Sequence, residues 1–200
     1  MNESASLDKA GWRTSMRLRR RGVTLAERKA AGDDAAALLR DWELRPPHGS
    51  RVATFLALAE ELPTAPVNKD LHAAGYKLVV PVWSAQERRY RFAEWQPGIR
   101  LIAGPMRVPQ PIEPCWVSTE QIALFLVPGL AFDRSGGRIG YGAGHYDCML
   151  AERKPSALCV AYGYAWQLVA ALPQTASDIR MDWVLTPSFI VKVGQTDRAP

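Results

Sequence analysis

The segment from residue 138 to residue 147 combines side chains and spacing that suit the binding of an anion. It reads Arg-Ile-Gly-Tyr-Gly-Ala-Gly-His-Tyr-Asp, so that glycines occupy alternate positions. Glycine allows backbone conformations in which successive N–H groups point at one anion, and a helix beginning here would add its positive end. Arg138 can bind phosphate oxygens through two N–H groups, and Asp147 can hold Mg2+. The segment therefore predicts a phosphate-handling loop.

A glycine-rich turn with Arg138 on the surface is the alternative interpretation, and glycine spacing alone would favour it. The segment lacks the Gly-Lys-Ser/Thr ending of a Walker loop, and its spacing differs from the dinucleotide-binding fingerprint. An arginine, three glycines, aromatic-type side chains and an aspartate lie within ten residues. This combination favours a functional loop.

Two other segments can bring charge to such a loop. Lys9 and Arg13 lie one helical turn apart, so both can face one triphosphate. A solvated basic helix face is the alternative, and we favour it for the neighbouring run from 17 to 21. Glu61 follows an apolar run, at the edge of a sheet where α/β proteins form ligand sites. On its own it is more simply interpreted as a surface carboxylate in a turn.

A longer match gives these residues a context. Residues 128–133 read P-G-L-A-F-D and residues 137–147 read G-R-I-G-Y-G-A-G-H-Y-D. Together they resemble the signature of the 5-formyltetrahydrofolate cyclo-ligase family. Residues 9–13 resemble its ATP-contacting Lys-x-x-x-Arg, residues 55–64 its folate-lining strand ending in Glu-x-x-Thr, and residues 181–185 its late Asp segment linked to Mg2+. The resemblance extends from Lys9 to about Leu185.

The resemblance implies conversion of 5-formyltetrahydrofolate to 5,10-methenyltetrahydrofolate, with ATP as co-substrate and Mg2+ as cofactor. It implies catalytic roles for Arg138, Tyr141 and His145, and Mg2+ ligation by Asp147 and Asp182. The implied ATP site consists of Lys9, Arg13, Arg138, Ile139, Gly140, Tyr141, Gly142, Ala143, Gly144, His145 and Tyr146. The implied folate site consists of Phe55, Leu56, Glu61, Tyr141, Gly142 and His145.

The chain departs from the family pattern at a few positions. Many members have Gly or Lys in place of Ala143, Tyr in place of His145, and a basic residue in place of Cys148. Some have Trp in place of Met106. From the residues alone, His145 is equally a ligand contact or a packed ring at a helix start. These departures concern pocket detail and affinity more than the reaction.

Two other functional classes remain open at this stage. One is a folate-binding or regulatory relative without turnover. The other is a nucleic-acid-binding module, because the net charge is +5, the pI is about 9.3 and the N-terminal region is rich in arginine. The basic residues do not continue into an aromatic stacking platform, which argues against the second class.

Short apolar runs alternate with helical patterns, which predicts an α/β fold with a largely parallel sheet. We expect strands near 52–56, 77–82, 90–95, 123–127 and 158–162, helices near 7–21, 24–42, 64–74 and 146–153, and a long loop over 128–141. The family resemblance implies three layers, similar to NagB, RpiA and CoA-transferases. We expect one domain over 1–200, with N-terminal helices over about 7–44 and the sheet portion over 51–193.

Compartment and assembly are predicted from weaker signals. The N-terminus shows no signal-peptide pattern, no apolar run is long enough to span a membrane, and three cysteines without paired spacing suit a reducing compartment. These observations predict a cytoplasmic protein with small-molecule partners. The resemblance favours a monomer.

Overall fold

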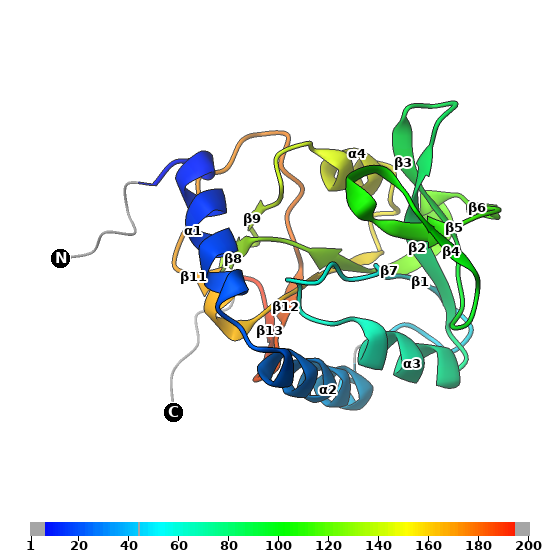
Figure 1. The fold of residues 1–200 in the computed structure, drawn as a ribbon, viewed down its shortest axis with the longest axis horizontal. Helices are drawn as coiled ribbons and strands as arrows, with labels where there is room; N and C mark the ends of the chain where they lie inside the picture. The colour runs from blue at the N-terminus through cyan, green and yellow to red at the C-terminus, as the bar shows by residue number, and fades with distance from the viewer. Residues whose placement is uncertain (1–6, 44, 195–200) are drawn as a thin grey trace.

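The computed structural model describes residues 7–43 and 45–194, and an eight-stranded sheet forms its centre (Figure 1). The strand order is β13-β12-β10-β7-β1-β2-β3-β6. The strands are β1 (Arg51–Ala53), β2 (Lys77–Ser84), β3 (Arg89–Glu94), β6 (Trp116–Val117), β7 (Ile122–Pro128), β10 (Leu158–Tyr162), β12 (Trp183–Leu185) and β13 (Ile190–Lys192). The five from β12 to β2 pair in parallel, and the others are antiparallel at the two edges. The predicted largely parallel sheet is confirmed.

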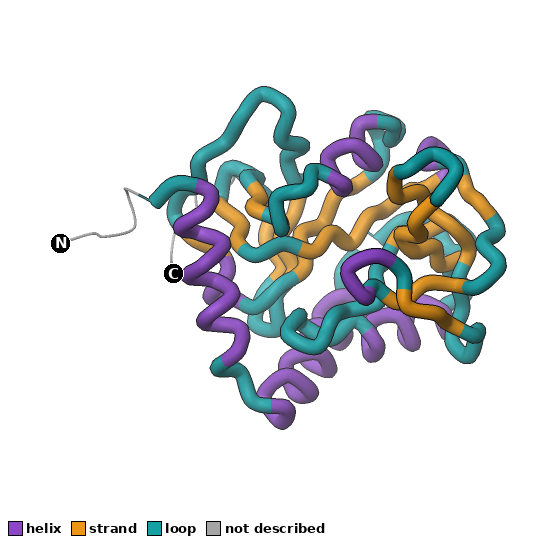
Figure 2. The backbone as a smooth tube through the Cα atoms, turned by 45° about the horizontal axis from the view of Figure 1, so that its top comes forward, coloured by secondary structure: helices purple, strands orange, loops and turns teal. Residues whose placement is uncertain are grey.

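Helices cover both faces of this sheet. Helices α2 (Leu25–Asp41) and α3 (Ala65–Ala73) lie on one face, and α4 (His145–Ala151) lies on the other (Figure 1). Strand β7 is apolar throughout because both of its faces are buried. Leu124 and Leu126 pack in the cluster with α2 and α3, whereas Phe125 and Val127 pack in the cluster with α4. Figure 2 shows the same layering from a second direction, with helices on either side of the strands.

The two N-terminal helices have different roles. Thr24 begins α2 with a capping box, in which its hydroxyl accepts from the Glu27 amide and the Glu27 carboxylate accepts in return. Helix α1 (Lys9–Arg21) instead packs Trp12 and Met16 against a second, three-stranded sheet. That sheet has the order β11-β8-β9, with β8 (Ala131–Asp133), β9 (Arg138–Ile139) and β11 (Leu168–Val169). Both helices were predicted; residue 44, where that region was expected to end, lies outside the described residues.

The prediction of one long loop over 128–141 is wrong, because β8 and β9 form an antiparallel pair within it. Asp133 stabilises this pair. Its buried carboxylate accepts hydrogen bonds from the amides of Ser135, Gly137 and Leu172 at 2.8, 2.8 and 2.9 Å. The contact with Leu172 involves a distant part of the chain, and β8 and β9 are only 3 and 2 residues long, so a local pattern does not reveal them. As a result Arg138 projects from a strand.

A two-stranded ribbon, also absent from the sequence prediction, adds a wall beside the main sheet. It comprises β4 (Leu101–Ala103), the short 3-10 helix η2 (Pro105–Arg107) and β5 (Pro109–Pro111). The Tyr90 hydroxyl donates to the Pro105 carbonyl at 3.2 Å, and the Trp83 amide donates to the Gln110 side chain at 3.1 Å. The ribbon is therefore tied to β2 and β3. Two further 3-10 helices are η3 (Thr119–Gln121) and η4 (Ala165–Gln167).

Within the described ranges, no helix is both long enough and apolar enough to cross a membrane.

Gly136 provides a test of how β9 is docked. Its φ is +89°, and an added Cβ would lie 2.6 Å from the Met181 carbonyl oxygen. Gly75 has a similar φ of +81° but open space around it. Gly75→Ala should lower the free energy of unfolding by about 1–2 kcal/mol, and Gly136→Ala by roughly 3 kcal/mol or more because a backbone contact must also shift. Urea unfolding of both variants measures the difference, and equal losses would contradict this packing.

Candidate functional site

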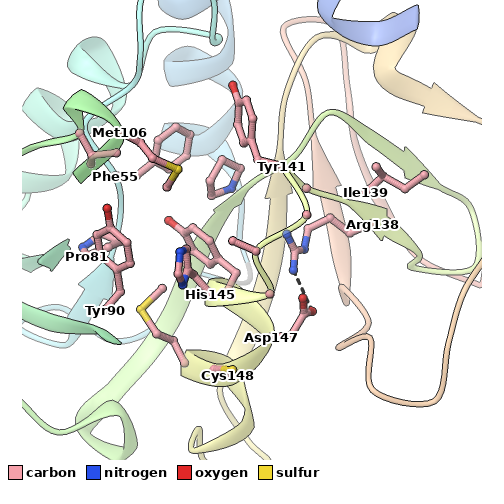
Figure 3. Close-up of a pocket in the computed structure, with 18 of the residues that line it drawn as sticks. Phe55, Pro81, Tyr90, Met106, Arg138, Ile139, Tyr141, His145, Asp147 and Cys148 are labelled. Carbon is pink, nitrogen blue, oxygen red and sulfur yellow. Dashed lines mark hydrogen bonds and ion pairs between the residues drawn. The ribbon is translucent and has the colours of Figure 1, made fainter. Parts of the chain in front are cut away.

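A cavity of about 690 Å3 opens beside the carboxyl ends of β1 and β7 (Figure 3). Ligand sites of parallel α/β sheets form at this edge. Its walls come from α1, the segments after β1 and β7, the ribbon, the glycine loop over 140–144, and α4. All the residues predicted to bind ATP or folate line this one cavity. Their roles in binding remain predictions.

The glycine loop is held by α1. The Arg13 Nε donates to the Gly140 carbonyl at 3.0 Å. Gly142 has a φ of +107°, and a Cβ at this position would lie 3.3 Å from the Arg13 guanidinium carbon. A side chain here would meet both a strained backbone and a charged neighbour, so glycine fits the position. The loop is therefore fixed by contact with the helix that carries Lys9.

Arg138 and Asp147 form an ion pair at the base of the loop (Figure 3). The Arg138 Nη2 lies 2.8 Å from the Asp147 Oδ1, and the Arg138 side chain is largely buried. The same carboxylate oxygen accepts from the Ile179 amide at 3.2 Å. Because both partners line the cavity, a cation and an anion stand side by side at its surface.

A second ion pair lies in the same wall. The Lys9 Nζ is 2.5 Å from the Asp178 Oδ2, and Asp178 also accepts from the Thr175 amide at 2.6 Å. Burial raises the pKa of Asp178, but hydrogen bonds from Lys9 and Thr175 outweigh it, so the pKa is below its usual value. Asp178 was missed from sequence. Nothing in its local spacing separates it from Asp182, four residues later.

The structure does not place Asp182 beside Asp147 in this cavity, and the predicted Mg2+ ligation by these two residues remains a prediction. Asp182 precedes β12, and its carboxylate accepts from the Cys159 amide at 2.7 Å. Its own amide donates to the Cys159 carbonyl, also at 2.7 Å. Both bonds join the beginnings of β10 and β12, and Asp182 is not among the residues that line the cavity.

The other side of the cavity is apolar around one buried carboxylate. Phe55, Pro81 and Met106 line it together with Glu61. Glu61 is only 5% exposed, so it is not the surface turn carboxylate that its sequence suggested. It accepts from the Leu58 amide at 2.9 Å. Burial raises its pKa, and the nearby guanidinium of Arg20 opposes that rise.

Arg20 corrects the prediction of a solvated basic run over 17–21. It is 1% exposed, donates to the Tyr141 hydroxyl at 3.1 Å and to the Gly129 carbonyl, and lies 3.7 Å from Glu61. Arg17 stacks over the Tyr141 ring at 5.1 Å. Arg21 does remain exposed, where it pairs with Glu60.

His145 and Tyr146 begin α4 at the floor of the cavity. The His145 ring packs edge-on against Tyr90, with ring centroids 4.9 Å apart, and lies 6.1 Å from Trp83. The Tyr146 hydroxyl is buried and has no hydrogen-bond partner among the described residues. His145 is therefore both a packed ring and a cavity residue, which combines the two interpretations that its sequence left open.

Within 7–43 and 45–194, no three His, Cys, Asp or Glu side chains gather as a metal site. The carboxylates available to the cavity are those of Glu61, Asp147 and Asp178. A cation held here would thus need oxygens from a ligand as well.

The fold and the cavity define an α/β protein with a partly basic cavity at the carboxyl edge of a parallel sheet. The model of the 5-formyltetrahydrofolate cyclo-ligase family matches residues 5–187. The chain belongs to this family, as its sequence motifs predicted.

Individual relatives agree along nearly the whole chain. A 5-formyltetrahydrofolate cyclo-ligase of Escherichia coli is 29% identical over 181 residues, which cover 88% of this chain and 98% of the relative. The one from Mycolicibacterium smegmatis is 28% identical, over 90% of this chain and 93% of the relative. The solved structure of a 5,10-methenyltetrahydrofolate synthetase from Aquifex aeolicus superposes with a TM-score of 0.77, at 23% identity and 96% coverage of both chains. A synthetase from Mycoplasma pneumoniae superposes with 0.73, at 18% identity, over 90% of this chain and 99% of its own. These two structures share the fold.

Proposed function

We propose that this chain catalyses the ATP- and Mg2+-dependent cyclisation of 5-formyltetrahydrofolate to 5,10-methenyltetrahydrofolate, releasing ADP and phosphate. One observation carries the proposal: a basic, glycine-lined wall and an apolar wall with a buried carboxylate belong to the same cavity. Two substrates of different chemistry can therefore meet inside it. The names of the relatives support the same reaction.

The basic wall suits a triphosphate. Lys9, Arg13 and Arg138 all line it, and Arg138 is largely buried, where charge–charge attraction is stronger than in water. The glycines of the loop leave backbone groups accessible to phosphate oxygens. We assign the ATP phosphates to this wall.

The apolar wall suits a pterin. A pterin is a flat ring with an amino group and ring N–H groups. A carboxylate can accept a pair of hydrogen bonds from these donors. Glu61 offers that carboxylate among Phe55, Leu56 and Pro81, and the unpartnered Tyr146 hydroxyl adds a polar group nearby. We assign the folate ring here, with Tyr141 and His145 between the two substrates.

The reaction requires the protein to align the two substrates, and it requires no covalent bond between protein and substrate. The formyl oxygen attacks the γ-phosphorus and ADP leaves, which converts a poor leaving group into a good one. Folate nitrogen-10 then attacks the formyl carbon, the carbon–oxygen bond breaks, phosphate departs and nitrogen-10 loses its proton. The positive side chains stabilise charge on the transferred group, and holding both substrates in one cavity replaces encounters in solution. No protein nucleophile is required.

The residues present fit Mg2+ bound together with a nucleotide. Magnesium in such sites uses one or two carboxylates and completes its shell with phosphates and water. Asp147 and Asp178 line the same wall, and the Ile179 amide beside Asp178 bonds to Asp147. We propose Asp147 and Asp178 as the Mg2+ ligands, in place of the predicted Asp147 and Asp182. The ion would supply neutralisation of charge on the phosphates.

We propose that the protein is a monomer, which the family resemblance favours. Cys115, Cys148 and Cys159 are all unpaired, which suits the reducing cytoplasm that we propose as its compartment.

Absorbance tests the proposed reaction directly. A methenyl folate absorbs in the near ultraviolet, where the formyl compound does not. We expect purified protein to produce this absorbance from 5-formyltetrahydrofolate only when both ATP and Mg2+ are present. Absence of the rise would overturn the enzymatic proposal; calorimetric folate binding without ATP consumption would then identify a non-catalytic relative.

Arg138→Ala should lower kcat by about 100-fold or more, because a buried group that stabilises transferring charge is lost. Arg40→Ala is the matched control, since Arg40 forms an exposed pair with Asp70 away from the cavity. Thermal melts must show both variants folded. Unchanged turnover in a folded Arg138→Ala protein would remove this residue from the mechanism.

Asp178 and Asp182 can be separated by their Mg2+ dependence. Asp178→Asn should raise the Mg2+ concentration needed for half-maximal turnover by about tenfold or more. Asp182→Asn should leave that concentration unchanged and lower the free energy of unfolding by at most about 1–2 kcal/mol, through its bond to Cys159. The reverse pattern in Mg2+ titrations would restore Asp182 as the ligand.

A further inference from the structure

Arg20 lies behind the cavity wall at the junction of three segments. Its Nη1 donates to the Tyr141 hydroxyl at 3.1 Å and lies 3.7 Å from the Glu61 Oε1, while its Nη2 donates to the Gly129 carbonyl. The residue is 1% exposed and is not among those that line the cavity. It therefore touches two predicted substrate-binding residues without reaching the substrate space itself.

We propose that Arg20 is a positioning residue for the folate side of the site, holding the Tyr141 hydroxyl and the Glu61 carboxylate in a fixed arrangement. This inference rests on the proposed function. It goes beyond the motif-bearing residues, because Arg20 belongs to a run that sequence assigned to solvent. A guanidinium has a rigid fork of donors, so one side chain can fix two partners in a set geometry.

Tyr141 needs such an anchor because of its neighbours. It lies between Gly140 and Gly142, so its backbone is less restricted than that of most residues. Its side chain is 41% exposed and lines the cavity. The Tyr141 hydroxyl accepts from Arg20 and also hydrogen-bonds to the Glu61 carboxylate, and the Arg17 guanidinium stacks over its ring. Arg20 contacts both members of the Tyr141–Glu61 pair, so without it the pair would lose the cation that both groups share.

The cost of burying Arg20 also points to function. A buried guanidinium loses its hydration, and its Nε has no partner among the described residues. An apolar residue could fill the same volume without that loss. A positive charge is useful here because Glu61 is buried, and only its ionised form can accept hydrogen bonds from a pterin with both oxygens and no competing O–H.

The groups that face Glu61 come from several elements. Arg20 is the cation; Tyr141 and Tyr146 are neutral phenols on the cavity side, and the Tyr164 hydroxyl donates to the Glu61 carbonyl. The Leu58 amide is a fixed donor to the carboxylate. Arg20 is thus the charged group that favours the ionised form, and its removal should raise the pKa of Glu61 further.

The test compares Arg20→Gln with Arg21→Gln, an exposed neighbour on the same helix. In Arg20→Gln the KM for 5-formyltetrahydrofolate should rise about tenfold or more, with a much smaller change in the KM for ATP. The acidic limb of kcat/KM for the folate should also move to higher pH by about one unit or more, because Glu61 becomes harder to ionise. Glu61→Gln should abolish that limb. Arg21→Gln should behave as the wild type.

The outcomes separate this inference from the reaction itself. An inactive wild-type protein contradicts the proposed function, whereas an active wild type with unchanged folate KM and pH profile in Arg20→Gln contradicts only the role of Arg20. Equal losses for both substrates without a pH shift would indicate a purely structural residue. If Arg20→Gln does not fold, Arg20→Lys decides: it should keep the wild-type pH limb and raise the folate KM about threefold or more, since one ammonium cannot reproduce the fork. A wild-type folate KM in Arg20→Lys would overturn the proposal.

Discussion

The cationic face of α1 is the constraint on which the cavity depends. Lys9, Arg13 and Arg20 lie on one side of the helix with Met16, and each contacts a residue of the wall: Asp178, the Gly140 carbonyl and the Tyr141 hydroxyl. Met16 and Trp12 pack the same side of the helix against β8 and β9. These contacts tie residues that are more than a hundred positions apart in the chain. Helix α1 therefore packs on the three-stranded sheet and lines the cavity, whereas α2 and α3 cover the main sheet.

This arrangement explains how the backbone of a glycine-rich loop is held in one conformation. Alternating glycines let the backbone approach an anion, but they also leave it with many conformations to lose. Arg13 bonds to the loop backbone and Arg20 bonds to the tyrosine within it, while Arg138 on β9 anchors its base through Asp147. Asp133 in turn secures β9. The freedom that glycine provides is therefore removed by charge-assisted contacts from outside the loop.

Sequence predicted the features that arise from local pattern. The buried strands, the Thr24 cap and the loop over 138–147 follow from apolar runs, capping chemistry and motif. The prediction of a solvated run over 17–21 did not separate Arg20 from its neighbours, although the sequence contains a signal that does. Arg20 continues the helical spacing of Lys9, Arg13 and Met16, whereas Arg19 and Arg21 do not. Asp178 could not be separated from Asp182 in this way. Their difference arises from the pairing of β10 with β12, which fixes Asp182 against Cys159 and leaves Asp178 at the cavity. The ribbon and the short strands β8 and β9 depend likewise on distant partners.

The two ion pairs of the basic wall suggest how the site is prepared for its ligand. Lys9 pairs with Asp178, and Arg138 pairs with Asp147. In the proposed reaction, Lys9 and Arg138 would hold the phosphates and Asp178 and Asp147 would hold Mg2+, so each of these charges would keep a partner. The exchange avoids leaving an unpaired charge in a partly buried wall, which would be costly. On the proposed folate side no such exchange is needed, because Arg20 lies behind the wall and Glu61 would keep its countercharge while accepting hydrogen bonds from the ring. The site therefore combines two ion pairs between residues that line the cavity with one ion pair whose cation, Arg20, lies behind the wall.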